Sequence, residues 1–169
     1  MLKTILIAAT ALLFFGCSSH TQHHAKHDHA KMPQMFQTVA HEKATLLQTS
    51  ETKESCPICG MNLVKFYKTS HAASHNETTH QYCSLHCLAD HLDSGNELKN
   101  PKVVDVASLE MISVMDAHYV VGSKVKGTMS RISKYAFKNY EDAKAFQKKN
   151  GGKILDFYGA LEVAREDFK

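Results

Sequence analysis

Four cysteines and a methionine lie in two short groups whose spacing suits a soft metal ion. The first group reads CPICGM over residues 56–61, and the second reads CSLHC over residues 83–87. Thiolate and thioether sulfurs are polarizable, so they select Cu(I), Zn(II) or iron–sulfur clusters over hard cations. The candidate ligands are therefore Cys56, Cys59, Met61, Cys83 and Cys87.

The local sequence predicts that sulfurs of both groups can point at one centre. Cys83 precedes a predicted helix and Cys87 falls in its first turn, where backbone N–H groups and the helix dipole lower a thiol pKa. Gly60 lets the backbone fold sharply behind the CxxC pair. If residues 59–61 are extended, Cys59 and Met61 face the same side of a strand, and a thioether beside thiolates favours Cu(I).

Other roles remain open for these residues. Four thiolates also suit a structural Zn(II) site, and bound zinc contributes about 10 to 16 kcal/mol to folding in small zinc-dependent peptides. An oxidising compartment would favour two disulfides instead. A thioredoxin-like redox pair at Cys56 and Cys59 is a third alternative, although neither a flanking Trp nor a βαβ context is present. Met61 also fits a core position at the start of a strand.

The elements that must position these ligands form two diverged copies of one strand–strand–helix–strand unit. The first copy contains an extended segment at 63–67, a polar loop at 71–79, a helix between Ser84 and Gly95, and a closing strand at 102–106. The second copy contains strands at 118–121 and 132–137, a helix between Asn139 and Gly151, a closing strand at 153–157, and an appended helix at 160–168. We therefore predict an α+β fold with two small tandem ββαβ-type units, at residues 54–110 and 111–169.

The N-terminus has the pattern of a bacterial lipoprotein signal. Lys3 precedes an apolar run that closes on Gly16, and this run is too short to remain as a membrane-spanning helix. We expect residues 1–16 to be a signal peptide, Cys17 to carry lipid, and residues 17–53 to form the anchor and a flexible linker. The resemblance to lipoproteins implies a location on the periplasmic side of a bacterial membrane, and Ser18 favours the outer membrane. An ordinary signal peptide is the alternative.

The linker is rich in histidine. His20, His23, His24, His27 and His29 lie within ten positions, in a segment with few large apolar side chains. Unstructured imidazoles bind borderline metals weakly and exchange them fast, so this segment could concentrate copper or zinc near the membrane. A solvated polar tether is an equally good interpretation.

Composition and motifs exclude two broad classes of function. The net charge is +3 at pH 7, and basic residues are not clustered as a nucleic-acid footprint requires. The sequence contains no nucleophile elbow, no paired-histidine metalloprotease motif and no phosphate-binding glycine loop. We therefore expect neither nucleic-acid binding nor catalysis.

Three further motifs accompany the first cysteine group. They read YVVGS over 119–123, GTM over 127–129 and GGKIL over 151–155. With CPICGM they resemble the NosL family of nitrous oxide reductase maturation lipoproteins, over about residues 56–157. The resemblance implies a pair of ββαβ domains, a lipid anchor, and delivery of Cu(I) to the copper centres of periplasmic nitrous oxide reductase. It also implies that Cys59 and Met61 carry the metal and that Met129 is a further candidate ligand.

Cys83 and Cys87 depart from the basic NosL pattern. Their spacing from Cys59 resembles the TRASH domain of copper and zinc trafficking proteins, and His86 between them is a further candidate ligand. The four cysteines hold either one Cu(I) or Zn(II), or a structural zinc that leaves Met61 outside. We expect a Cu(I) chaperone whose partner is a periplasmic copper enzyme or its maturation machinery. The alternative is an interaction or metal-sensing module built around structural zinc.

Overall fold

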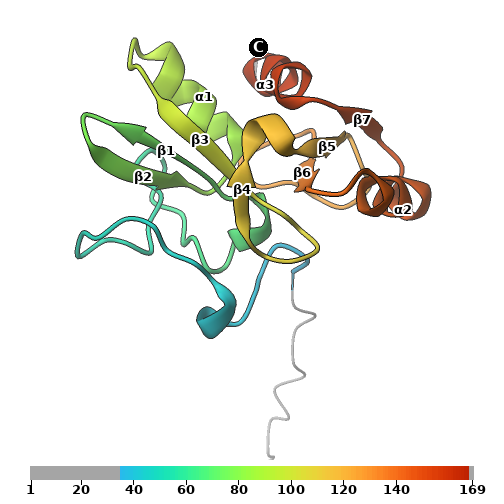
Figure 1. Ribbon diagram of the computed structural model, residues 1–169, viewed down its shortest axis with the longest axis horizontal. Helices are drawn as coiled ribbons and strands as arrows, with labels where there is room; N and C mark the ends of the chain where they lie inside the picture. The colour runs from blue at the N-terminus through green and yellow to red at the C-terminus, as the bar shows by residue number, and fades with distance from the viewer. Residues whose placement is uncertain (1–34, 168–169) are drawn as a thin grey trace, which may run out of the picture. The chain divides into compact units, whose positions relative to one another are not determined.

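The structure, a computed structural model, describes residues 35–167 (Figure 1). Two antiparallel sheets and three α-helices make up this part of the chain, which confirms the predicted α+β class. The predicted signal peptide, the predicted lipidation site Cys17 and the histidines between His20 and His29 lie outside the described residues. Within the described range, no helix has the length and apolar character needed to cross a membrane.

The first sheet has four strands in the order β2-β1-β3-β4, and helix α1 follows its hairpin in the chain (Figure 1). Its elements are β1 (His71–His75), β2 (Thr78–Tyr82), α1 (Leu85–Asp93), β3 (Lys99–Val104) and β4 (Met111–Ser113). The strand–strand–helix–strand order matches the prediction, but β1 and the first residues of β2 lie in the segment that we expected to be a loop.

Residues 71–79 were expected to form a polar loop, and this expectation is wrong. β1 and β2 form a hairpin whose two-residue turn, Asn76 and Glu77, has φ angles of 45° and 64°. Two successive left-handed residues define the tight turn that matches the twist of an antiparallel pair. Glu77 is an unusual residue for this position, so the turn carries no Asn-Gly or Asp-Gly signal.

Residues 63–67 were expected to be extended, and they instead form turns that lead into a short 3₁₀ helix at Tyr67–Thr69. Leu63, Val64 and Tyr67 are nevertheless buried. Their apolar side chains therefore fill the core from an irregular segment, which explains why the composition resembled that of a strand.

Helix α1 begins and ends where the sequence predicts. Ser84 is its N-cap, and the Ser84 hydroxyl accepts a hydrogen bond from the Cys87 amide. Gly95 follows the helix with a φ of 86°, the left-handed conformation that commonly terminates helices. The buried face of the helix carries Leu85, Cys87, Leu88 and Ala89.

The second sheet has three strands in the order β6-β5-β7. Its elements are β5 (His118–Val121), β6 (Lys134–Phe137), α2 (Tyr140–Asn150), β7 (Lys153–Leu155) and α3 (Phe157–Glu166). Gly152 is required at the start of β7, because a Cβ there would lie 2.7 Å from the Val121 carbonyl oxygen and its φ is 98°. Helix α3 packs beside α1, so the appended helix covers the first unit (Figure 1).

The two sheets share one apolar core. A single cluster of buried side chains contains Cys83, Leu88 and Val103 from the first half and Tyr119 and Leu161 from the second. A parallel bridge between Asp105 and Ala136 also joins the sheets. The buried Asp105 carboxylate accepts backbone hydrogen bonds from Ala107, Ser108 and Lys138, which fixes this junction.

Two buried polar contacts add to this core. The ring of His71 stacks on Tyr119, its Nδ1 lies 3.0 Å from the Thr69 carbonyl oxygen, and its Nε2 lies 3.2 Å from the Tyr119 hydroxyl. Elsewhere, the Lys134 ammonium lies 2.9 Å from the Asp167 carboxylate, with side chains 4% and 1% exposed. Both contacts join segments that are distant in the sequence.

The described part of the predicted flexible linker is packed rather than free. The side chain of Gln37 is buried and donates to the Lys126 carbonyl oxygen at 2.5 Å. The buried Gln81 of β2 accepts from the Leu47 amide at 2.9 Å and donates to the Thr45 carbonyl oxygen at 3.3 Å. Residues 45–47 therefore contact the first sheet, and Gln37 contacts the second half of the chain, so the expectation of a flexible tether is wrong for this stretch.

Candidate metal centre

The four cysteines converge on one point. The sulfur of Cys59 lies 3.4 Å from that of Cys83 and 3.6 Å from that of Cys87, and the Cys83 and Cys87 sulfurs are 3.8 Å apart. With Cys56 included, all four sulfurs lie within 4.8 Å of one another. A tetrahedral site with Zn–S bonds of about 2.3 Å has sulfur–sulfur edges of about 3.8 Å. The four side chains therefore already have the spacing of a four-thiolate site.

A closed turn presents the first pair of sulfurs. The Gly60 amide donates to the Cys56 carbonyl oxygen at 2.8 Å, and the Cys56 amide donates to the Met61 carbonyl oxygen at 2.9 Å. An isolated bridge between Ser55 and Asn62 closes the base of this turn. Gly60 adopts a φ of 75°, as the sharp fold behind the CxxC pair requires.

The start of α1 presents the second pair. Cys83 directly precedes the Ser84 N-cap, and Cys87 lies in the first turn of the helix, so the predicted placement is confirmed. The Thr69 hydroxyl lies 2.8 Å from the Cys83 carbonyl oxygen and 2.8 Å from the Thr128 hydroxyl. Through the Thr69 hydroxyl, the backbone of Cys83 is therefore linked to Thr128 in the second half of the chain.

The pKa values of the thiols in the cluster shift in opposite directions. Hydrogen bonds from Cys83 and Cys87 lower the pKa of Cys56 strongly. Donation to Cys56 raises the pKa of Cys83 and of Cys87, and burial raises both further. The lowering of these two pKa values by the helix dipole stays a prediction. Metal binding must displace protons here, as at other thiolate sites.

The sulfurs differ in their access to solvent. Cys56, Cys83 and Cys87 are buried, at 2%, 0% and 1% exposure, whereas Cys59 is partly exposed. Beside Cys59, Ile58 is an exposed large apolar side chain. The cluster is thus enclosed by the core on one side and reachable through the CxxC turn on the other.

The remaining candidate ligands have different surroundings. Met61 and Met129 are partly buried and pack against the apolar cluster that contains Cys56, Cys83 and Cys87. Residues 59–61 are not part of a strand, so the alternating-strand argument for pairing Cys59 with Met61 is wrong. Met129 has a left-handed φ of 45°, and its neighbour Thr128 is hydrogen-bonded to Thr69.

His86 is turned toward α3. Its Nδ1 lies 3.4 Å from the Ala164 carbonyl oxygen and its Nε2 lies 3.4 Å from the Asp90 carboxylate. Among the described residues, the group close enough to share one ion consists of the four cysteines alone. Those cysteines are free thiols in the structure.

A comparison with protein families shows which family this chain belongs to. The model of the NosL family matches residues 47–162, which include the cysteine cluster and both sheets. The chain belongs to the NosL family. The family match also spans the GTM loop and the GGKIL segment that the sequence comparison used.

A solved structure shares this NosL fold. The crystal structure of the copper chaperone NosL from Shewanella denitrificans matches with a TM-score of 0.53 and 24% sequence identity, covering 66% of this chain and 92% of that one. A comparison with curated protein sequences found no match.

Sequence reasoning missed one group of side chains near this centre. His75, His80 and His91 lie together on the α1 side of the first sheet. Because residues 71–79 were expected to form a loop, the alternation that places His75 and His80 on one face was not recognised. Cys87 and His91 are four residues apart on one predicted helix, and this spacing could have indicated that His91 lies on the same helix face as a cysteine.

Proposed function

We propose that this NosL-family protein is a Cu(I) metallochaperone held on the periplasmic side of a bacterial membrane. The observation that carries this proposal is the four-sulfur cluster with one partly exposed member. Soft sulfur ligands bind Cu(I) tightly. A reachable Cys59 offers a partner's ligands a place to attack, so that copper passes by ligand exchange and no catalysis is needed.

The candidate donors for the Cu(I) cargo in this proposal are the thiolates of Cys56, Cys59, Cys83 and Cys87 and the thioethers of Met61 and Met129, and a low-coordinate set drawn from them binds the ion. Both methionines pack against the apolar cluster that includes three of the sulfurs. The family match, together with the described role of the similar crystal structure as a copper chaperone, supports a role in copper handling. We propose nitrous oxide reductase, or the machinery that assembles its copper centres, as the recipient.

A structural zinc site is the second candidate function. The sulfur separations of 3.4 to 3.8 Å fit the edges of a tetrahedral four-thiolate zinc site, and three of the sulfurs are buried. In this alternative the metal holds the CxxC turn against α1 permanently, and the protein acts as an interaction or sensing module.

Competition between Cu(I) and Zn(II) distinguishes the copper chaperone from the structural-zinc module. The reduced full chain is loaded with one equivalent of Zn(II) and then titrated anaerobically with chelator-buffered Cu(I), with the metal count read by native mass spectrometry. We expect one Cu(I) to displace the zinc. Replacing Met61 or Met129 with leucine should weaken Cu(I) binding by about tenfold, equal to about 1.4 kcal/mol, and leave Zn(II) binding unchanged.

Met115→Leu is the matched control, because Met115 is a 60% exposed methionine. Zinc that resists Cu(I), together with Cu(I) binding that neither leucine variant changes, would favour the structural-zinc module. Transfer of ⁶⁵Cu from the loaded chain to metal-free nitrous oxide reductase then tests the recipient, and retention of the isotope by the chain argues against it.

The proposed location rests on Cys17 and the apolar run before it. We expect the expressed chain to sediment with membranes and Cys17→Ser to appear in the soluble periplasmic fraction. Separation of inner and outer membranes on a density gradient tests the proposed outer-membrane location. Equal membrane association of Cys17→Ser and the unchanged protein would contradict lipid anchoring through this residue.

A further inference from the structure

Three histidines outside the cysteine cluster lie together on the first sheet and α1. The ring centre of His91 lies 5.5 Å from that of His75 and 5.4 Å from that of His80, and the centres of His75 and His80 are 6.4 Å apart. His75 belongs to β1, His80 to β2 and His91 to α1. Three elements therefore contribute one imidazole each to the same place.

The strand register explains why the rings meet. His75 pairs with Thr78 and His80 pairs with Ala73, so both histidines occupy the face that also carries His71 and Tyr82. His91 comes from the last turn of α1, and its Nδ1 lies 2.7 Å from the Tyr82 hydroxyl of that face. His91 is one helical turn beyond Cys87, so the trio lies next to the cysteine cluster along α1.

We propose that His75, His80 and His91 form a second metal site, which takes a borderline divalent ion such as Zn(II) or Cu(II). Neutral imidazole is the preferred nitrogen ligand of these ions. Two imidazoles bound to one ion through nitrogens at about 2.0 to 2.1 Å have ring centres roughly 5 to 6.5 Å apart, depending on the angle at the metal. The two separations from His91 suit ligand angles near the tetrahedral value, whereas the 6.4 Å between the rings of His75 and His80 must shorten before one ion can bind all three.

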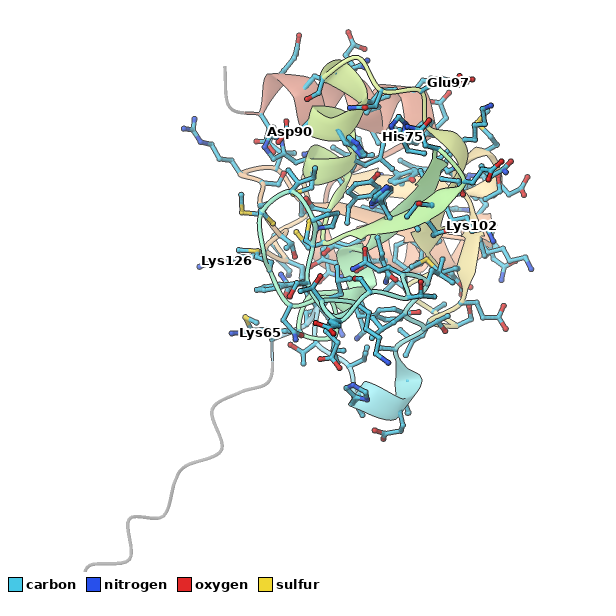
Figure 2. The ribbon with its side chains drawn as sticks, turned by 90° about the vertical axis from the view of Figure 1, so that its left-hand side faces the viewer. Lys65, His75, Asp90, Glu97, Lys102 and Lys126 are labelled. Atoms are coloured by element: carbon cyan, nitrogen blue, oxygen red, sulfur yellow. The ribbon has the colours of Figure 1, made fainter. Side chains whose placement is uncertain are left out.

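The surrounding groups hold two of the rings in orientations that suit ligands. His75 Nδ1 lies 3.1 Å from the Glu97 carbonyl oxygen, so Nδ1 donates there and leaves Nε2 with a lone pair (Figure 2). Nε2 of His75 lies 2.9 Å from the Asn76 amide, a surface group that an ion would displace. Tyr82 can accept from Nδ1 of His91 in the same way. Metal-bound histidines usually donate their second N–H to such partners.

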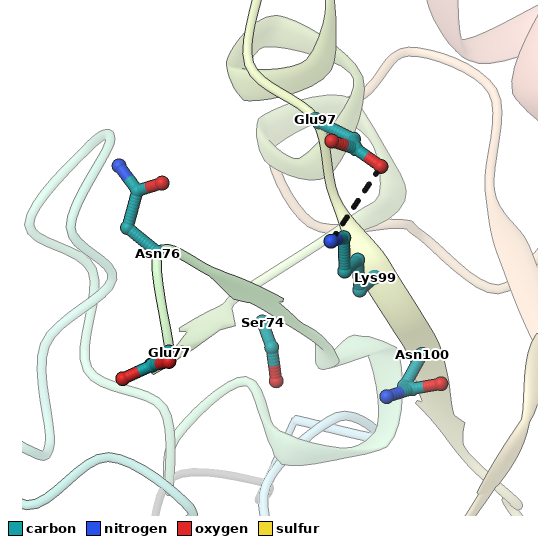
Figure 3. Close-up of a pocket in the computed structure, with 6 residues that line it drawn as sticks. All are labelled: Ser74, Asn76, Glu77, Glu97, Lys99 and Asn100. Atoms are coloured by element: carbon teal, nitrogen blue, oxygen red, sulfur yellow. Dashed lines mark ion pairs between the residues drawn. The ribbon is translucent and has the colours of Figure 1, made fainter.

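The three histidines are half-buried. Burial, with the charges of His80 and His75, lowers the pKa of His91, which favours its neutral form. A surface hollow of about 510 Å³ next to His75 is lined by Ser74, Asn76, Glu77, Glu97, Lys99 and Asn100 (Figure 3). None of the three histidines lines this hollow, and Ser74 faces the side of β1 opposite His75, so access to the trio depends on the partial exposure of the histidines themselves.

The three imidazole rings lie together, but their nitrogens are not yet close enough to share one ion. Among the described residues, only the four cysteine sulfurs are already close enough to share a metal. Binding at the trio therefore requires the rings to move closer together, which a change in the rotamer of His80 on the edge strand β2 can provide. The two sites differ in donor chemistry, so they can be filled separately whichever ion the cysteines hold.

A two-step zinc titration tests this site. The reduced full chain with ¹⁵N-labelled histidine receives one equivalent of Zn(II), which occupies the cysteines, and then a second equivalent. We expect the second equivalent to shift the imidazole nitrogens of His75, His80 and His91. His80→Gln and His91→Gln should each weaken the second binding step at least tenfold and leave the first step unchanged.

His118→Gln is the matched control, since His118 lies on β5 of the other sheet. His80 lies on the edge strand β2, so His80→Gln preserves the fold even if His91→Gln disturbs the Tyr82 contact; a thermal melt of each variant checks this. The proposal is overturned if the second equivalent shifts only the histidines between His20 and His29, or if both variants bind it as the unchanged protein does.

Discussion

Cys83→Ser is expected to weaken metal binding at the four-sulfur cluster by at least about a hundredfold. A four-ligand zinc site contributes about 10 to 16 kcal/mol, so one ligand accounts for roughly 3 kcal/mol, which is more than a hundredfold in affinity. Cys83 lies within 3.8 Å of two other sulfurs, and a serine oxygen is a harder and weaker donor for Cu(I) or Zn(II). Chelator competition under reducing conditions measures the loss.

A second variant separates the loss of a ligand from a damaged fold. Cys83 is fully buried, so Cys83→Ser also places a hydroxyl in the core. Cys59 is partly exposed, and Cys59→Ser should cause a similar loss of affinity while the metal-free protein keeps its melting temperature. Affinities within threefold of the unchanged protein for both variants would rule out a shared site built from these sulfurs.

Acidification from pH 6.5 to pH 4 is expected to reduce the stability of the metal-free protein by about 3 kcal/mol through His71 alone. Complete burial lowers the pKa of His71 to about 4, against about 6.5 in an unfolded chain. Between these values the unfolded chain binds a proton that the folded chain excludes. The free energy of unfolding therefore falls as the pH falls, by about 1.4 kcal/mol per pH unit.

Urea unfolding at several pH values, with a chelator present, measures this slope. His71→Gln keeps a neutral hydrogen-bonding group and should remove about 1.4 kcal/mol per pH unit from the slope between pH 4 and 6.5. His118→Gln should leave the slope intact. The lowered pKa of Cys56 produces a slope of the same sign, which remains in both variants, so only the difference between the two variants reports on His71. Equal slopes would show that His71 does not titrate in this range.

Elements with local signals were predictable from the sequence. Ser84 before an apolar helical pattern, Gly95 after it, and the paired glycines 151 and 152 after α2 each encode a helix boundary in a few adjacent residues. The grouping of the four cysteines was also predictable, because their types and spacing indicate a soft-metal site, and their sulfurs do converge. The family match is consistent with this part of the prediction.

Features that depend on the tertiary structure were not predictable. The hairpin of β1 and β2 has small and polar side chains and an Asn-Glu turn, so it lacks both strand propensity and a turn signal. Gln81 is buried there because residues 45–48 satisfy its amide, which no local pattern indicates. The histidine trio depends on that hairpin and was missed with it. Assignment of Met61 and Met129 as copper ligands stays a prediction.

The apolar cluster that runs through both sheets gives metal occupancy a wider effect. Three of the sulfurs belong to the same buried cluster as Tyr119, Phe157 and Leu161, so the free energy of binding an ion there stabilises β5 and α3 as well as the CxxC turn. A ligand that binds only the folded state shifts the whole folding equilibrium. Loss of an ion bound at the cysteines is therefore expected to expose the whole folded part of the chain to proteases more often, and not the CxxC turn alone.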